Sequence, residues 1–176
     1  MTWIKAGECT ALQNRAQPSF TPVIQRVDPI MSSIITDAFT HDHHACDHRL
    51  AAAEKSLTSG DWAVIGRASE ALISAVNHHF DVEEQTLFPR LASIYRVASN
   101  PIEVMCSEHA QMRALLGDLG EAVAQRDRDT CQGVLETFHF LTQQHNSKEE
   151  IVLYPMADGA LRDQATEIAG LVARES

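Results

Sequence analysis

Hydrophobic residues recur at helical spacing through most of this chain. After His43, apolar positions follow at offsets of 3, 7, 10 and 14 residues, and after His109 the offsets are identical. Such offsets place side chains on one face of an α-helix. No segment shows the alternation typical of a strand, so the pattern predicts an all-α protein.

Caps and breakers divide this pattern into helices. Asp28-Pro29 and Asn100-Pro101 each combine a capping side chain with proline in a first helical turn. A stop at Gly60 precedes a new start at Asp61-Trp62, and Arg126–Asp129 predicts a tight turn. The predicted helices therefore cover about 29–57, 61–89, 101–125 and 129–155. We expect Pro89 to end or bend the second helix and the fourth to end near Pro155.

Four long helices with short connections predict an antiparallel up-down-up-down four-helix bundle. We expect residues 1–28 to form an N-terminal arm or lead-in helix and residues 29–156 to form the bundle. Residues 157–176 should add a short C-terminal helix packed on the bundle. Its expected apolar face is Leu161, Ala165, Ile168 and Val172.

One phrase occurs twice, 66 residues apart: His79–Pro89 and His145–Pro155 both read His-x-x-x-Glu-Glu-x-x-Leu-Phe/Tyr-Pro. Asp42-His43 and Glu108-His109 each place a histidine 36 residues before the histidine of the phrase. At about 1.5 Å per residue, the chain runs about 24 Å from His43 down to the Gly60 turn and about 27 Å back up. The paired histidines should therefore lie level. The candidate metal ligands are His43, His79, Glu83, His109, His145 and Glu149.

These residue types suit a pair of cations. In His-x-x-x-Glu the two side chains are about 40° apart around a helix and about 6 Å apart along it, so both reach one site. Two buried carboxylates facing each other would repel. A dinuclear centre removes that conflict if Glu83 and Glu149 bridge and the four histidines are terminal ligands. This mixed set of imidazoles and carboxylates suits iron, with manganese or zinc as alternatives. It leaves coordination positions open for an oxo or hydroxo bridge and a small ligand.

The remaining polar residues near the pattern have simpler interpretations. A single histidine on an apolar face is more often a core residue than a ligand, but six residues at one repeat distance favour a site. The other histidines lie about 100° or more around the helix from a candidate ligand, which predicts surface or supporting positions. They are His41, His44, His48, His78 and His139.

Glu84 and Glu150 also point about 100° away from the neighbouring candidate ligands, as solvated groups or as hydrogen-bond partners of the ligands. Asp47 and Arg113 either support the site or are rim charges. Cys46 and Cys106 are expected to be small buried hydrophobes. A regular helix places Tyr154 on the far side from His145, so no radical or proton role is assigned to it, and it is expected to be a core residue.

Composition narrows the function classes. The net charge of −10 argues against nucleic acid or an anionic membrane as partner. The four cysteines form no CxxC pair, which argues against a disulfide framework or a zinc ribbon. The first residues hold no apolar core of a signal peptide, and no run approaches the roughly 18 apolar residues of a spanning helix. A cytoplasmic location is therefore expected.

Together the two phrases and the two preceding pairs resemble the hemerythrin-like (HHE cation-binding) family, four-helix bundles that hold a di-iron centre. The resemblance covers about residues 30–156. Oxygen-carrying hemerythrins have a fifth histidine where this chain has Arg113, and an aspartate five residues after the last histidine. The set of four histidines and two glutamates is more similar to the family's iron–sulfur-cluster repair proteins. Those proteins carry an N-terminal cysteine-bearing domain, which Cys9 alone does not match.

The resemblance implies a protein with two iron ions that binds or reacts with O2, NO or peroxide, in stress handling, sensing or repair of an iron–sulfur protein. It leaves open whether the protein is an enzyme. A reversible oxygen or iron store, a sensor module and a purely structural metal site are the alternatives.

Overall fold

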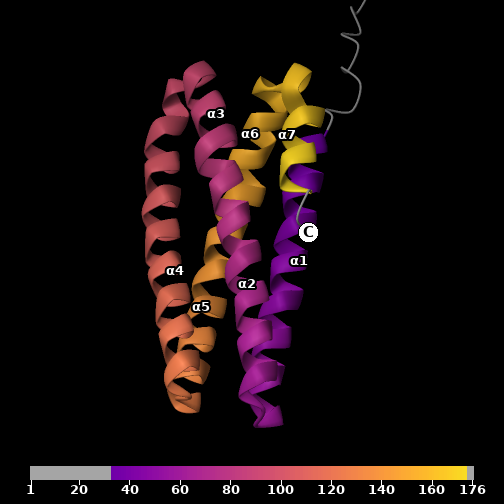
Figure 1. Cartoon of the computed structure of the whole chain (residues 1–176). Helices are drawn as coiled ribbons and strands as arrows, with labels where there is room; N and C mark the ends of the chain where they lie inside the picture. The colour runs from indigo at the N-terminus through magenta and orange to yellow at the C-terminus, as the bar shows by residue number, and fades with distance from the viewer. Residues whose placement is uncertain (1–32, 174–176) are drawn as a thin grey trace, which may run out of the picture.

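The computed structural model describes residues 33–173, and the described part is helical with no strand (Figure 1). The prediction of an all-α bundle is confirmed. Its long helices are α1 (Ile34–Ser56), α2 (Trp62–Val82), α4 (Ser99–Gln125) and α5 (Arg128–Lys148). Shorter helices are α3 (Phe88–Ile94), α6 (Tyr154–Ala160) and α7 (Ala165–Val172). The 3₁₀ turns are η1 (Leu57–Ser59), η3 (Arg96–Ala98) and η5 (Arg162–Gln164).

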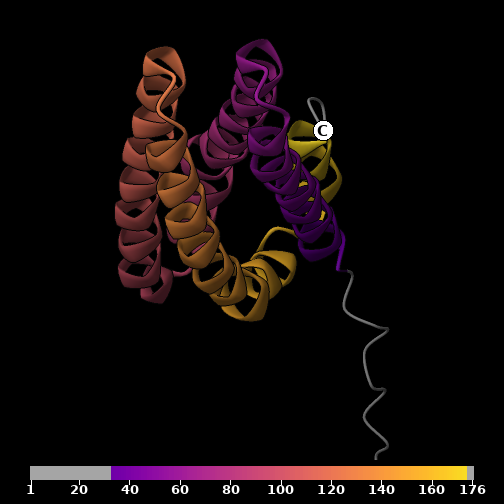
Figure 2. The ribbon, with the colours of Figure 1, turned by 90° about the horizontal axis from the view of Figure 1, so that it is seen from below.

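The long helices pack as two hairpins. α1 packs on α2 and α4 packs on α5, while α2 also contacts α4 and α1 contacts α5. Seen from below, the two hairpins lie side by side, with their tight turns at the same end of the molecule (Figure 2). α7 packs on α1 and α2, and so lies against the first hairpin.

Local chemistry fixes the two tight turns. Gly60 adopts a φ of 72°, a left-handed conformation that glycine tolerates best, and the Asp61 side chain accepts a hydrogen bond from the Ala63 amide. In the other hairpin Arg126 has a φ of 57°, and Asp127 caps α5 by accepting from the Thr130 amide. Both predicted turns are confirmed.

The start of the third long helix is shifted slightly from the prediction. α4 begins at Ser99, directly after η3, so Pro101 lies inside its first turn. Proline is tolerated there because first-turn amides have no partner within the helix. The predicted cap at Asp28-Pro29 and the predicted arm over residues 1–28 lie outside the described residues, and the division of the chain into 1–28, 29–156 and 157–176 stays a prediction.

The expectation that the fourth helix ends near Pro155 is wrong. A π-helical turn, η4 (Glu149–Leu153), joins α5 to α6, and η2 (Glu83–Leu87) joins α2 to α3 in the same way. The amides of Phe88 and Tyr154 donate to the carbonyls of Glu83 and Glu149, five residues back. A proline amide cannot donate, and its ring crowds the carbonyl four residues earlier. The chain passes Pro89 and Pro155 by widening one turn and then continues as helix.

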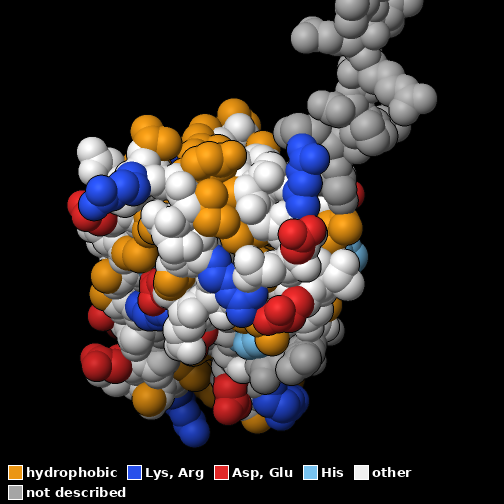
Figure 3. Space-filling model, turned by 90° about the horizontal axis from the view of Figure 1, so that it is seen from above, with side chains coloured by type: hydrophobic (Ala, Val, Ile, Leu, Met, Phe, Trp, Pro, Cys, Tyr) orange, Lys and Arg blue, Asp and Glu red, His pale blue; other side chains and the backbone are white. Residues whose placement is uncertain are grey.

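The interior has two apolar layers. The lower layer lies toward the tight turns and includes Leu72, Leu116 and Phe138. The upper layer includes Leu87, Leu153 and the α7 residues Ile168 and Val172. Hydrophobic side chains of this upper end are partly visible among scattered charges when the molecule is seen from above (Figure 3). The six predicted ligands lie between the two layers. Within residues 33–173, no helix combines the length and apolar character needed to cross a membrane.

Candidate metal centre

All six predicted ligands are buried and lie together. Each is at most 3% exposed: His43, His79, Glu83, His109, His145 and Glu149. The histidines come from the four long helices, and each glutamate is the first residue of a π-helical turn. Helices that are far apart in sequence thus bring one polar cluster into an apolar interior.

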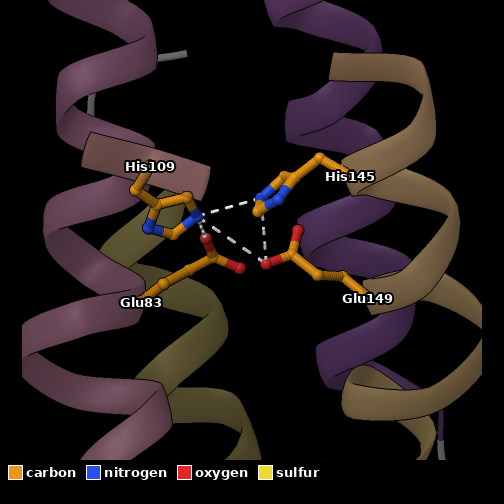
Figure 4. Close-up of side chains that lie close together, drawn as sticks. All are labelled: Glu83, His109, His145 and Glu149. Carbon is orange, nitrogen blue, oxygen red and sulfur yellow. Dashed lines mark hydrogen bonds and ion pairs between the residues drawn. The ribbon is translucent and has the colours of Figure 1, made fainter. Parts of the chain in front are cut away.

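One group of candidate metal-ligand atoms lies between α4 and α5 (Figure 4). The Nε2 atoms of His109 and His145 are 2.9 Å apart. His109 Nε2 lies 3.3 Å from Glu83 Oε2, and His145 Nε2 lies 3.2 Å from Glu149 Oε1. These four side chains meet closely enough to hold one metal ion.

A second group lies between α1 and α2. The Nε2 atoms of His43 and His79 are 3.1 Å apart, and His43 Nε2 is 3.4 Å from Glu149 Oε2. Glu149 therefore directs one oxygen to each group. Glu83 Oε2 is shared as well, because it lies 3.4 Å from His79 Nε2 in addition to its contact with His109. Each group could hold a metal ion, and Glu149 belongs to both groups.

Each of the four histidines is held by a carboxylate on its other ring nitrogen. The Nδ1 distances to the carboxylate oxygens are 2.8 Å for His43–Glu150, His79–Asp42 and His109–Glu84, and 2.9 Å for His145–Glu108. A carboxylate accepts, so Nδ1 must carry the proton and donate it. In a neutral imidazole this leaves the Nε2 lone pair directed into the cluster.

The cluster consequently holds more acceptors than donors. Within each histidine pair the Nε2 lone pairs face each other at hydrogen-bonding distance, and Glu83 Oε2 and Glu149 Oε1 are buried without a hydrogen-bond donor. Unpaired buried acceptors are costly. A cation would satisfy them. Neighbouring ligands on a six-coordinate ion with bonds of about 2.1 Å lie about 3 Å apart, close to the spacings here.

The pKa values show the same imbalance. Burial lowers the pKa of His43, but hydrogen bonds to Glu149 and Glu150 outweigh it and raise that pKa to about 9. Burial would raise the pKa of Glu149, but His145 and His43 lower it below its ordinary range. Without a metal, protonated histidines therefore supply the positive charge that balances the buried carboxylates.

Tyr154 is part of this cluster, which corrects the expectation that it lies on the far side of its helix. Its hydroxyl is 3.0 Å from His43 Nε2, 2.8 Å from Glu83 Oε1 and 3.0 Å from Glu149 Oε2. In a regular helix it would point away, but the i→i+5 bond in η4 stacks it one turn after Glu149 on the same face. The repeated Leu-Phe/Tyr-Pro was the sequence signal for this change of helix register.

The equivalent residue of the first hairpin, Phe88, offers no polar group. Its ring stacks on the ring of His109 with centroids 5.9 Å apart, and the Phe80 ring also stacks on His109, with centroids 3.9 Å apart. The two halves of the cluster therefore differ: a phenol borders His43, whereas hydrocarbon borders His109.

The supporting residues settle several open alternatives. Glu84 and Glu150 are hydrogen-bond partners of histidines and are only partly solvated. Arg113 donates to Glu84 and so holds the carboxylate that orients His109. Its guanidinium also donates to Asp81 and lies over the Phe80 ring. Burial opposes it, but Arg113 and His109 lower the pKa of Glu84 and keep it ionised. Asp47 is exposed.

The other histidines stay outside the cluster, as predicted. His41, His44, His48 and His139 are exposed, and His78 is half-buried and donates to the Leu171 carbonyl. Cys46 is a buried free thiol, and burial raises its pKa to about 12, in agreement with a packing role. Cys106 is partly buried, and Cys9 lies outside the described residues.

Comparison with known proteins agrees with this centre. Searches of curated proteins and of solved structures give no significant match. A scan of family models matches the hemerythrin HHE cation binding domain over residues 34–167, which includes α1 to α6 and all six clustered side chains. The matched region also contains the buried cluster of histidines and glutamates that could hold metal. The chain therefore belongs to the hemerythrin HHE cation-binding family.

Proposed function

We propose that His43, His79, Glu83, His109, His145 and Glu149 bind two iron ions. The observation that carries the proposal is the excess of buried acceptors: two pairs of facing Nε2 lone pairs and two carboxylate oxygens without donors. The histidines would be terminal ligands, and Glu83 and Glu149 would lie between the two ions. Imidazole with carboxylate suits iron, and manganese or zinc would satisfy the same atoms.

The protein's task in this proposal is to bind or react with O2, NO or peroxide, during oxidative or nitrosative stress, as a sensor, or in repair of iron–sulfur proteins. Bound iron would supply a redox-active Lewis acid for such ligands. The surrounding chain prepares the centre. Carboxylates on Nδ1 fix each imidazole and increase its basicity, and the rings of Phe39, Phe80 and Phe88 exclude water.

A reversible store or sensor without turnover is the second candidate. The burial of all six proposed ligands favours it, because a closed centre can hold a ligand without releasing a reactive product. A structural metal site would need the same burial but no open coordination position.

Metal analysis with optical spectroscopy separates these functions. Protein from iron-supplemented cells should contain about two iron ions per chain and absorb in the near-ultraviolet. The spectrum should change when an anaerobic sample meets O2, NO or peroxide. Catalytic loss of peroxide or NO would indicate an enzyme, and a stoichiometric change would indicate a store or sensor. A colourless protein that retains zinc after iron supplementation would contradict the proposal.

A further inference from the structure

We infer that small ligands reach the proposed metal centre between α4 and α5, past an ion pair of Glu108 and Lys148. This inference rests on the proposed function, since it concerns the route to that centre. It comes from comparing the two hairpins, whose equivalent residues are 66 positions apart. The duplicated fold offers two equivalent places for such a route, and the structure treats them differently.

Between α4 and α5 there is a cavity of about 100 Å³, lined by sequence neighbours of His109 and His145. It has room for a few molecules of water size. Buried Met112 lines it one turn from His109, and Gln144 lies directly before His145. The remaining lining residues are Glu108, Gln111, Leu141 and Lys148.

The ion pair lines this cavity, and Glu108 also contacts a proposed ligand. One oxygen of Glu108 accepts from His145 Nδ1 at 2.9 Å, and the other accepts from the Lys148 ammonium. The Lys148 side chain is 45% exposed, and ion pairs this exposed are weak. Lys148 can therefore swing into solvent while Glu108 still holds His145. The pair forms a gate that opens without disturbing a ligand.

The equivalent place between α1 and α2 is closed by α7. Asp42, the counterpart of Glu108, has a side chain 7% exposed, against 25% for Glu108. His78, the counterpart of Gln144, bonds the Leu171 carbonyl of α7 at 3.2 Å. Val82, the counterpart of Lys148, is buried in one apolar cluster with Ile168 and Val172 of α7. The C-terminal helix thus covers the first of the two places with hydrocarbon and main chain.

The inner end of the route agrees with this assignment. On the His43 side of the cluster, the Tyr154 hydroxyl already contacts His43, Glu83 and Glu149. A ligand arriving between α4 and α5 would instead meet the centre beside His145.

Azide association with the iron-loaded full chain tests the route. The double variant Gln111→Trp/Gln144→Trp fills the mouth of the cavity with two rings. It should slow azide association, followed by stopped-flow absorbance, by about tenfold or more, with unchanged iron content and final spectrum. The matched control is Ala110→Trp/Gln143→Trp, which places the same rings at neighbouring exposed positions and should keep the wild-type rate.

Two further variants make the test independent of the bulky rings. Lys148→Ala removes the gate and should accelerate association, whereas His78→Ala loosens the α7 side and should not. A rate unchanged in both the Lys148→Ala and the double tryptophan variants would overturn the route, as would acceleration in His78→Ala alone. If iron-loaded wild type gives no spectral change with azide, the proposed function fails and the route fails with it.

Discussion

Glu149 and Glu150 are adjacent in sequence, but Glu149 lies among the proposed ligand atoms and Glu150 lies outside them. Glu149 is fully buried with one oxygen toward each histidine pair, whereas Glu150 is a third exposed and holds His43 through Nδ1. We predict that Glu149→Gln loses one or both metal ions. Glu150→Gln should keep two ions per chain with metal affinity weakened about 10- to 100-fold, the usual effect of removing a support of a ligand.

Metal content after loading, together with a chelator titration, measures both effects. His44→Ala is the matched control, because its ring is exposed one residue after a proposed ligand. Equal metal content in the Glu149→Gln, Glu150→Gln and His44→Ala variants would contradict the ligand assignment.

Tyr154 contributes a single hydrogen-bond donor to a cluster rich in acceptors. We predict that Tyr154→Phe lowers the free energy of unfolding of the metal-free protein by about 1–3 kcal/mol, because a buried carboxylate loses its donor. Urea denaturation of the metal-free protein measures this change. Phe88→Leu provides a control in which the other hairpin loses ring packing but no donor. Identical denaturation of Tyr154→Phe and wild type would show that the hydroxyl does not satisfy these acceptors.

At this scale the sequence predicts inward-facing residues well, because His43, His79, His109 and His145 follow the period of the buried face. It does not predict the Nδ1 partners, since each carboxylate lies on a different helix from the histidine it holds. Those pairings depend on how the helices pack, which periodicity along one helix does not describe.

At the scale of elements, the caps define the hairpins independently of the centre. Asp61 accepts from the Ala63 amide at the far end of α2 from the cluster. We predict that Asp61→Ala lowers the free energy of unfolding by about 1 kcal/mol, as loss of a helix cap does, and leaves metal content unchanged. Denaturation and metal analysis check both parts, and Asp47→Ala, at an exposed mid-helix position, serves as control. Loss of metal in Asp61→Ala would mean that the turn and the centre are coupled.

The helix starts at Asp61 and Asp127 are predictable because each is a local event between a side chain and nearby amides. The π-helical turns are less so. Predicting the face of Tyr154 from a constant 100° per residue fails once η4 inserts a wider turn. Pro155, six residues after Glu149, marks the cause, but a proline also permits a kink or a helix end, so sequence alone does not select among them.

At the scale of the whole molecule, the metal-free protein should be sensitive to alkali. The pKa of His43 is raised in the folded state to about 9, from an ordinary value of 6.5. Its contribution to stability is therefore fully present below about pH 6.5 and is lost as pH rises toward 9. We predict that the free energy of unfolding of the metal-free protein falls by a few kcal/mol over that interval.

The acid side follows the opposite sign. The pKa values of Glu84, Glu108, Glu149 and Glu150 are lowered in the folded state. Their contributions are present above the unfolded pKa near 4.3 and are lost as pH falls through the folded values. Metal-free stability should thus be highest between about pH 4.5 and 6.5. Denaturation at several pH values measures this, and the metal-loaded protein should lose less between pH 6.5 and 9. A flat profile for the metal-free protein over that interval would contradict this account.

We propose that two iron ions lie between the paired histidines. Anomalous diffraction at the iron absorption edge, from crystals of iron-loaded protein, tests it most directly. We expect two anomalous peaks, one beside His43 and His79 and one beside His109 and His145, with Glu83 and Glu149 between them. A single peak elsewhere in the molecule, or iron-loaded protein with no peak between these histidines, would contradict it.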